Sequence, residues 1–218
     1  MKQTENENAL KYWEQIYTDR GTGKIKTDTW MDDFTDMIEA CCTPILDLGC
    51  GDGNDTLRLM QIGKKVIACD QSETALKNLR MNIPNVFETR CLNILDKLPF
   101  DDNMFGIVIC DLCLHYFTKN DTLQILEEIQ RVLLPDGHLL FRVNSVNDVN
   151  YGACEGTEIE HHLYETDDHR LKRFFDEADI REIFGVFNIE FLQEDIMTRY
   201  GPEKHLFRGC VKKQSSFD

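Results

Sequence analysis

The chain has 218 residues, 42% of them hydrophobic and 29% charged, and it contains no apolar run of the roughly 20 residues that would cross a bilayer. These values exclude a membrane-spanning protein and suit one globular domain over residues 1–218. The formal net charge of −15 would repel a nucleic acid, and no run of Lys and Arg offsets it, so a nucleic-acid partner is disfavoured.

The N-terminal sequence MKQTENENALKYW has neither the basic segment nor the apolar segment of a secretory signal. We therefore expect a cytoplasmic protein whose nine cysteines are thiols. Cys110 and Cys113 form the only CxxC pair, and no second pair stands at the spacing of a zinc site. A structural role is therefore expected for the cysteines, in preference to metal or redox use.

Two helices are expected in the first part of the chain. Apolar residues recur at helical spacing from residue 8 to about residue 20, after a polar start that we expect to fray. A second apolar stripe at helical spacing covers residues 30–41. Residues 1–43 are therefore predicted to form a helical cap, with the capacity to act as a lid over a ligand.

Strands and helices alternate from residue 44 onward. Strands are expected at 44–48, 64–70, 85–92, 105–110 and 137–144, and helices at 55–63, 72–82 and 121–134. Such alternation predicts a parallel sheet with helices on both faces. Residues 185–213 predict two strands joined through Gly201 and Pro202. The expected fold is α/β: a doubly wound, mostly parallel, seven-stranded Rossmann-like sheet with an antiparallel C-terminal hairpin strand.

A glycine-rich turn follows the first of these strands. The stretch ILDLGCGDGNDT places Gly49, Gly51 and Gly53 where the backbone of an open α/β sheet can approach a ligand. Asp70 ends the next strand, at the place where an acidic residue in such folds binds ribose hydroxyls. The two features together predict a ligand that contains a nucleoside. Asn54 stands where the dinucleotide pattern GxGxxG requires its third glycine, which disfavours NAD.

The charge of the turn narrows the ligand further. Asp47, Asp52 and Asp55 make it acidic, which suits a ligand with positive charge better than it suits a pyrophosphate. A sulfonium that also carries an ammonium group is such a ligand.

Four stretches in order resemble the successive motifs of the class I S-adenosylmethionine-dependent methyltransferases: ILDLGCGDGNDT, VIACDQS, LPFDDNMFGIVICDLCLHYF and RVLLPDGHLLFRVNS. The resemblance covers about residues 44–145 and makes 44–144 the expected cofactor-binding core. It implies S-adenosylmethionine as cofactor, S-adenosylhomocysteine as product, and in-line transfer of a methyl group.

The resemblance also implies where the cofactor lies. It places Asp47, Gly49 and Gly51 at the methionine part with Asn54 in the same turn, Asp70 and Gln71 at the ribose, Asn93 and Ile94 at the adenine, and Asp111 and Leu112 near the sulfonium. Asn93 replaces an Asp that is common in the family, although its carbonyl can still accept a hydrogen bond. In relatives the N-terminal helix often closes over the cofactor, so Tyr12, Trp13 and Tyr17 are lid candidates, with burial against the sheet as the alternative.

Methyl transfer depends mainly on alignment, which can be worth about 7–11 kcal/mol, and it needs a general base only when the acceptor atom is protonated. The residues that follow the fourth and fifth strands are candidates for contact with the acceptor: His115, Tyr116, Arg142 and Asn144. Ordinary hydrogen bonds within loops are the alternative role for each of them.

Residues 145–166 form an acidic insertion, in which we expect substrate choice to be made. Its candidate residues are Tyr151, Glu155, Glu158, Glu160, His161, His162 and Tyr164, and a solvated acidic lid is the alternative. A metal site at His161, His162 and His169 is considered, but adjacent histidines usually diverge, so no metal is predicted. Residues 167–218 are expected to supply helical segments at about 167–184 and the terminal hairpin.

The expected acceptor is a small molecule. Enzymes that methylate amino groups of nucleic-acid bases resemble one another in an Asn- or Asp-Pro-Pro-aromatic stretch, where this chain has DLCLHYF. Residues 140–160 resemble, loosely, the corresponding region of small-molecule and tellurite- or thiol-directed methyltransferases. Two alternatives stay open: a non-catalytic scaffold that binds S-adenosylmethionine, and an NAD-dependent oxidoreductase.

Overall fold

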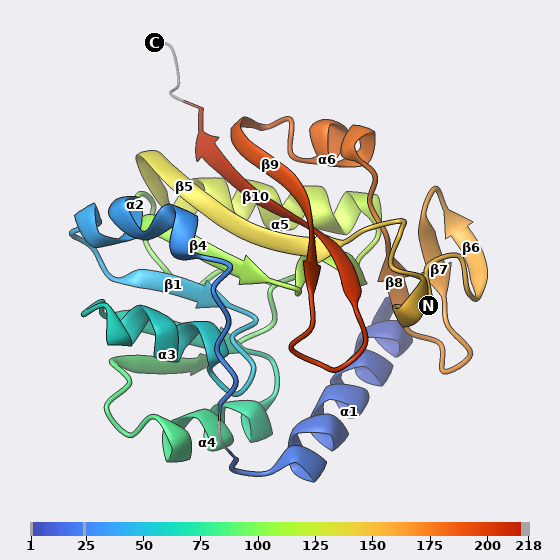
Figure 1. The fold of residues 1–218 in the computed structure, drawn as a ribbon, viewed down its shortest axis with the longest axis horizontal. Coiled ribbons are helices and arrows are strands. Elements are labelled where there is room, and N and C mark those ends of the chain that lie inside the picture. The colour runs from blue at the N-terminus through green and yellow to red at the C-terminus, as the bar shows by residue number, and fades with distance from the viewer. Residues whose placement is uncertain (1, 24, 215–218) are drawn as a thin grey trace.

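The computed structural model describes residues 2–23 and 25–214, so that Met1, Lys24 and the chain end at 215–218 lie outside it. A central sheet has the strand order β3-β2-β1-β4-β5-β10-β9 (Figure 1). Its strands are β1 (Ile45–Leu48), β2 (Val66–Asp70), β3 (Glu88–Cys91), β4 (Phe105–Asp111), β5 (Leu133–Asn144), β9 (Phe187–Met197) and β10 (Lys204–Lys213). β1 to β5 pair in parallel, and β10 is antiparallel to both of its neighbours. The predicted α/β sheet with an antiparallel C-terminal hairpin is confirmed.

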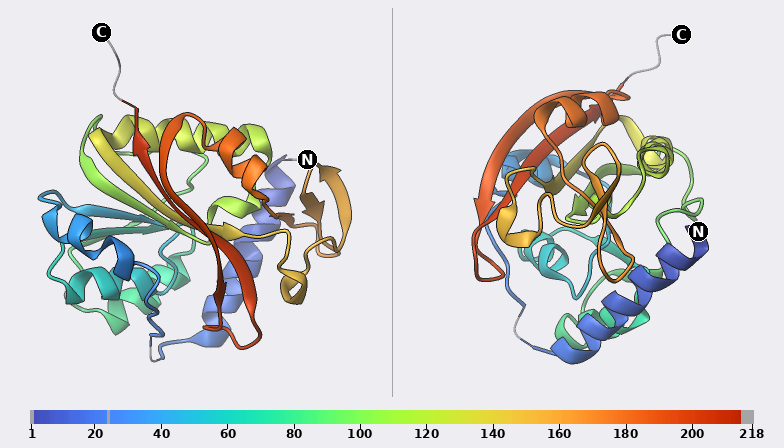
Figure 2. Two further views of the ribbon diagram at one scale, coloured as in Figure 1. Left: turned by 45° about the horizontal axis from the view of Figure 1, so that its top comes forward. Right: turned by 90° about the vertical axis from the view of Figure 1, so that its right-hand side faces the viewer.

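Helices cover both faces of this sheet, as Figure 2 shows. One face carries α2 (Thr35–Ala40), α3 (Asn54–Gln61) and α4 (Glu73–Asn82). The other face carries α5 (Lys119–Val132) and α6 (Glu177–Ile183). Because both faces are covered, every residue of β1 and β2 is buried, and each large apolar side chain there contributes about 1.5–3 kcal/mol by leaving water.

Local sequence explains where several helices begin. The side chain of Ser72 accepts a hydrogen bond from the backbone N–H of Ala75 at the start of α4 (3.0 Å). Thr118 accepts one from Asp121 N–H at the start of α5 (3.1 Å). Asp176 begins α6 with a capping box. Such caps satisfy N–H groups that have no partner within the helix, and each is typically worth about 1 kcal/mol.

Three expectations about local structure are wrong. Residues 133–134 do not end a helix but begin β5, because Leu133 pairs with Phe105 of β4. The segment at 171–173 is not helical but forms a strand, β8 (Leu171–Arg173). The first helix, α1 (Lys2–Arg20), begins within the polar start for which the sequence predicts fraying.

The insertion folds into a sheet of its own. β6 (Thr157–Glu160), β7 (Leu163–Glu165) and β8 form three antiparallel strands beside the carboxyl edge of the main sheet (Figure 1). α1 crosses the same edge, where the amide of Asn78 in α4 donates a hydrogen bond to the carbonyl oxygen of Tyr17 (2.8 Å). The carboxyl ends of the parallel strands therefore face a wall made by α1, the small sheet and the β9–β10 turn. None of the helices in the described residues has the length and apolarity to cross a membrane.

Candidate functional site

A cavity of about 750 Å³ lies at this carboxyl edge. It is bounded by the loops that follow β1, β2, β3 and β4, by α1, and by segments of the insertion and of the β9–β10 turn. The predicted site residues that line it are Tyr12, Trp13, Gly49, Gly51, Asn54, Asp70, Gln71, Asn93, Ile94, Asp111, Leu112, His115 and Tyr116. Three of the residues predicted at the strand ends do not line it: Asp47, Arg142 and the fully buried Asn144.

The glycine-rich turn requires glycine for two physical reasons. Gly49 and Gly51 have φ angles of +73° and +54°, in the left-handed region that other residues rarely adopt. A Cβ on Gly49 would lie 2.6 Å from Cβ of Cys113, and a Cβ on Gly51 would lie 2.6 Å from Oη of Tyr17. One side of the turn's backbone thus packs against the loop that follows β4 and against α1. The other side of the backbone faces the cavity.

Replacing Gly49 with alanine tests this packing against a matched control. Gly63 has φ +79°, but a Cβ added there would meet nothing within 4 Å, so Gly63→Ala should cost only the left-handed backbone penalty of about 1–2 kcal/mol. Gly49→Ala should lower the free energy of unfolding by at least about 1 kcal/mol more than Gly63→Ala does, because the side chain of Cys113 must also move. Urea denaturation measures both values, and equal losses in the two variants would contradict the close approach.

Asp70 is held in place at the end of β2. Its carboxylate accepts hydrogen bonds from the backbone N–H groups of Gly51 and Ser72, each at 2.9 Å. Burial raises the pKa of Asp70, while these hydrogen bonds act in the opposite direction. The carboxylate therefore joins the glycine turn to the second strand and lies in the wall of the cavity.

Asp47 lies beneath the turn, not in the cavity wall, so its predicted place beside a ligand is not what the structure shows. It is 1% exposed, and the hydroxyl of Thr56 donates a hydrogen bond to it (2.6 Å). Burial raises the pKa of Asp47. This hydrogen bond links β1 to α3, so Asp47 stabilises the glycine-rich turn from the side that faces away from the cavity.

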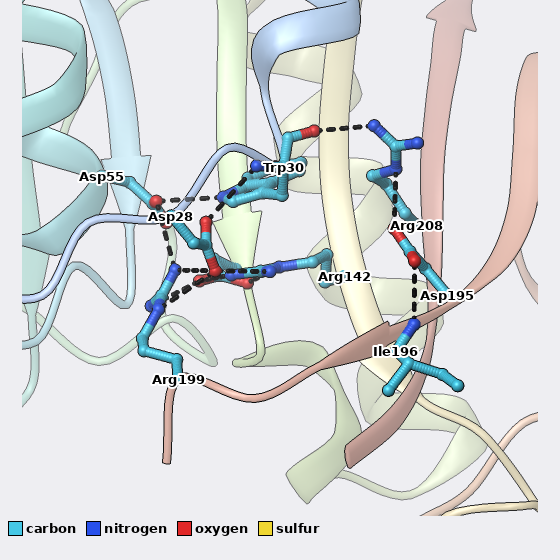
Figure 3. A network of polar contacts seen from close by, with 9 residues as sticks. Asp28, Trp30, Asp55, Arg142, Asp195, Ile196, Arg199 and Arg208 are labelled. Carbon is cyan, nitrogen blue, oxygen red and sulfur yellow. Dashed lines mark hydrogen bonds and ion pairs between the residues drawn. The ribbon is translucent and has the colours of Figure 1, made fainter. Parts of the chain in front are cut away.

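Arg142 belongs to a buried network of ion pairs (Figure 3). Its Nε and Nη2 donate to the two oxygens of Asp111 at 2.6 and 2.7 Å, and its Nη1 donates to Asp28 at 2.9 Å. Arg199, from the β9–β10 turn, lies 2.6 Å from Asp28 and 3.4 Å from Asp111. The predicted contact of Arg142 with an acceptor is therefore corrected: its guanidinium is occupied by carboxylates, and the residue is 2% exposed.

The network sets the charge of Asp111 at the end of β4. Burial opposes ionisation of this carboxyl, but Arg142 and Arg199 outweigh it and hold the pKa of Asp111 below its usual value. The neighbouring Asp55 accepts a hydrogen bond from Trp30 Nε1 (3.0 Å), and burial together with Asp111 raises its pKa well above the usual value. Asp111 thus lines the cavity as a carboxylate paired with Arg142, whereas burial favours the protonated form of the neighbouring Asp55.

Aromatic side chains of α1 form one wall of the cavity. The centre of the Trp13 ring lies 5.9 Å from that of Tyr17, stacked at 29° to it, and 5.7 Å from that of Tyr116, in edge contact. Tyr17 is buried and Tyr12 and Trp13 are half-buried. α1 therefore packs on the domain, which is the alternative expected for these residues, and it also lines the cavity. Closure of the helix over a cofactor stays a prediction.

His115 is almost completely buried, with 1% of its surface exposed, in the short 3-10 helix η2 (Leu114–Tyr116). Its Nδ1 has no hydrogen-bond partner among the residues that the structure describes. Burial, with the charges of Lys204 and Lys172, holds the pKa of His115 well below its usual value. The ring is therefore neutral at pH 7 and has a nitrogen free to accept a proton or a hydrogen bond.

Several cavity residues carry no signal in the sequence: Arg170, Lys172, Arg199, Tyr200 and Lys204. They lie in β8 or directly before it, and in the β9–β10 turn or at the start of β10. No sequence motif surrounds them. Of the residues expected in the insertion, Tyr151 and Glu155 line the cavity. Glu158, Glu160, His161, His162 and Tyr164 do not.

The histidines of the insertion are arranged differently from the expectation. The rings of His161 and His162 stack at 3.7 Å and do not diverge, and Nδ1 of His162 lies 2.7 Å from Asp179. Their group also includes Asp176, whereas His169 pairs with Glu165. Asp176 and Asp179 are already engaged in the capping box of α6.

Comparison with known proteins agrees with this geometry. Residues 46–141 match the family described as "Methyltransferase domain". The chain is 35% identical over 122 residues to YqeM of Bacillus subtilis, which is named as a methyltransferase, covering 52% of this chain and 49% of that protein. It is 28% identical over 214 residues to the tRNA N(3)-methylcytidine methyltransferase Mettl2 of Drosophila melanogaster, covering 86% and 63%. The chain thus spans about half to two thirds of these relatives.

Solved structures share the fold at lower identity. A methyltransferase of Methanosarcina mazei superimposes with a TM-score of 0.67 at 21% identity, covering 78% of this chain and 92% of its own. The 1,6-didemethyltoxoflavin-N1-methyltransferase of Burkholderia thailandensis, solved with its substrate and S-adenosylhomocysteine, gives 0.65 at 20% identity, covering 85% and 79%. The chain is thus similar to the methyltransferase domain over residues 46–141, and its fold is that of the class I, Rossmann-like methyltransferases.

Proposed function

We propose that the chain binds S-adenosylmethionine in this cavity and transfers its methyl group to a small-molecule acceptor. The observation that carries the proposal is that the Asp70 carboxylate and the bare backbone of Gly49 and Gly51 face one cavity of about 750 Å³. That volume is within the range of small-molecule sites. The relatives named as methyltransferases and the Burkholderia structure with its small bound acceptor support it.

The residues present fit this cofactor. The bare backbone of Gly49 and Gly51 lines the cavity, and Asp70 offers a carboxylate where ribose hydroxyls could donate. Asn93 and Ile94 lie in the wall reached by the third strand, where an adenine would bind, and the acidic turn suits a cationic ligand. When bound, S-adenosylmethionine supplies an electrophilic methyl group, and transfer of that group leaves a neutral thioether.

The chain's own residues would align the reactants and accept a proton. The aromatic side chains of α1 and Tyr116 would cover the bound reactants, and the carboxylate of Asp111, paired with Arg142, lies in the same cavity wall. The neutral His115 lines the cavity, and its imidazole can take a proton from an acceptor N–H, O–H or S–H as the new bond to carbon forms. Alignment supplies the remainder of the rate enhancement.

Asparagine in place of His115 tests the role as base. We expect His115→Asn to leave the affinity for S-adenosylhomocysteine unchanged and to lower turnover of a protonated acceptor by about 10²-fold, the lower end of general-base contributions. His138 lies on β5 beside Glu190, outside the cavity lining, so His138→Asn is the matched control. Normal turnover in His115→Asn would return this residue to a structural role.

Binding and turnover test the proposal separately. Calorimetric titration with S-adenosylmethionine, S-adenosylhomocysteine and NAD should show binding of the two adenosyl ligands and none of NAD. Binding of NAD alone would favour the oxidoreductase instead. Formation of S-adenosylhomocysteine with a panel of small acceptors then separates an enzyme from a scaffold that only binds.

A nucleic-acid acceptor is the principal competitor to a small molecule, because one relative is named as a tRNA methyltransferase. The net charge of −15 opposes binding of a polyanion. Methylation of tRNA in preference to small acceptors would overturn the small-molecule assignment. The location we propose is cytoplasmic, supported by cysteines that are all free thiols.

A further inference from the structure

Most of the cations that line the cavity lie on one side of it, although the chain as a whole is strongly acidic. The half formed by the strand ends and the glycine turn carries the carboxylates Asp52, Asp55, Asp70 and Asp111. The half formed by the insertion, β8 and the β9–β10 hairpin carries the cations Arg170, Lys172, Arg199 and Lys204 together with the acids Glu155, Asp167 and Asp168. The two halves of one cavity therefore differ in charge, and they call for ligand groups of different charge.

The partners of these cations show where positive charge is left over. Nζ of Lys204 donates to the fully buried carboxylate of Asp148 at 2.6 Å. The guanidinium of Arg170 pairs with Asp168 at 2.7 Å and lies 3.5 Å from the ring centre of Tyr12. Arg199 pairs with Asp28 and Asp111, so three of the four cations are compensated by protein carboxylates.

Lys172 is the cation without such a partner. Its Nζ donates to the backbone carbonyl of Tyr151, and it makes no ion pair with a carboxylate anywhere in residues 2–23 and 25–214. Burial, with Lys204 second, lowers the pKa of Lys172 to about 8, although Asp148 and Glu155 act in the opposite direction. A half-buried ammonium group beside another ammonium group is unfavourable unless an anion approaches it.

The surplus charge lies next to the proposed base. Lys172 lies on β8, which packs against η2, the element that carries His115, and Lys172 and Lys204 both contribute to the lowered pKa of His115. A molecule with an anionic group at Lys172 and a nucleophilic atom near His115 would therefore occupy both features at once. Its negative charge would also offset the two cations that disfavour protonation of His115.

We propose that the acceptor is a small molecule bearing an anionic group, a carboxylate or a phosphate, which Lys172 binds from the cationic half of the cavity. This assignment rests on the proposed methyl transfer and adds to it the class of acceptor. Lys204 and Arg170 surround the same group without giving up their own carboxylates. Tyr151 contributes the carbonyl that orients Lys172.

The test uses the full chain saturated with S-adenosylhomocysteine, so that failure of cofactor binding is detected first. Inorganic phosphate and benzoate are then titrated into the wild type, Lys172→Met and Lys64→Met. Lys64 is the matched control, because it too donates to backbone carbonyls but lies away from the cavity. We expect at least about tenfold weaker anion binding in Lys172→Met and no change in Lys64→Met.

Turnover gives the second readout. Small carboxylic acids and phosphorylated compounds are compared as acceptors with their neutral amides and alcohols, by formation of S-adenosylhomocysteine. The acids should be preferred, and Lys172→Met should raise KM for them while kcat changes little. Two results would overturn the anionic acceptor even if S-adenosylhomocysteine binds. One is equal affinity of the wild type and Lys172→Met for anions. The other is methylation of neutral compounds or tRNA in preference to the acids. Failure of S-adenosylhomocysteine to bind would overturn the proposed function itself.

Discussion

Methionine in place of Arg142 is expected to lower the free energy of unfolding by about 3–5 kcal/mol. The guanidinium neutralises Asp111 through two hydrogen bonds and Asp28 through a third, in a region where its own side chain is 3% exposed and that of Asp111 is 9% exposed. Removing it leaves Arg199 alone to face both carboxylates. A buried charge without a partner is costly because no water can solvate it.

Urea denaturation measures this loss, and an exposed pair supplies the comparison. Arg181 bonds to Glu177 within α6, with both side chains more than half exposed, so Arg181→Met should change stability by no more than about 0.5 kcal/mol. The double variant Arg142→Met with Asp111→Asn should recover part of the loss, since it also removes a stranded charge. A loss below about 1 kcal/mol in Arg142→Met would show that the network is hydrated and weak.

Replacing Asp70 with alanine is expected to weaken binding of S-adenosylhomocysteine by about 4 kcal/mol, which is roughly a 10³-fold rise in Kd. Two effects add. The proposed hydrogen bonds from the ribose hydroxyls lose a charged acceptor, and the N–H groups of Gly51 and Ser72 lose the carboxylate that orients the turn. Isothermal titration calorimetry on the folded variant measures the change.

Asparagine at the same position separates charge from shape. Asp70→Asn keeps one oxygen acceptor and the size of the side chain, so an intermediate loss of roughly tenfold is expected. A thermal unfolding curve for each variant confirms that the sheet is intact. An Asp70→Ala protein that is folded and binds S-adenosylhomocysteine like the wild type would refute the assignment of Asp70 to the ribose.

Much of the main sheet could be predicted because its signals are local. The run ILDL and the run VIACD are buried on both faces, so their sequences are continuously apolar apart from the terminal or inward carboxylates. Ser72 and Thr118 precede their helices as capping residues. Where the prediction was wrong, pairing between strands prevailed over the helical pattern of the single segment: Leu133 pairs with Phe105, and Leu171 pairs with Glu165.

The candidate cofactor residues could be predicted for a related reason. Parallel strands end at one edge of the sheet, so a motif at each strand end identifies neighbours in space without knowledge of the tertiary structure. Gly49, Asp70, Asn93 and Asp111 follow four successive strands and line one cavity. Asp47 and Arg142 were placed wrongly because the side on which a strand residue points, and the partner it meets there, depend on neighbouring elements.

The sequence by itself determined the alternating strands and helices, the glycine turn and the strand-end residues, since each depends on interactions within a few residues of chain. Only the tertiary structure decided the role of Arg142, which pairs with Asp28 across 114 positions, and the gathering of Arg170, Lys172 and Lys204 beside His115. Those contacts join segments that no periodicity relates. Their geometry follows from how the insertion and the terminal hairpin pack on the sheet edge, and their energetics follow from the burial that this packing creates.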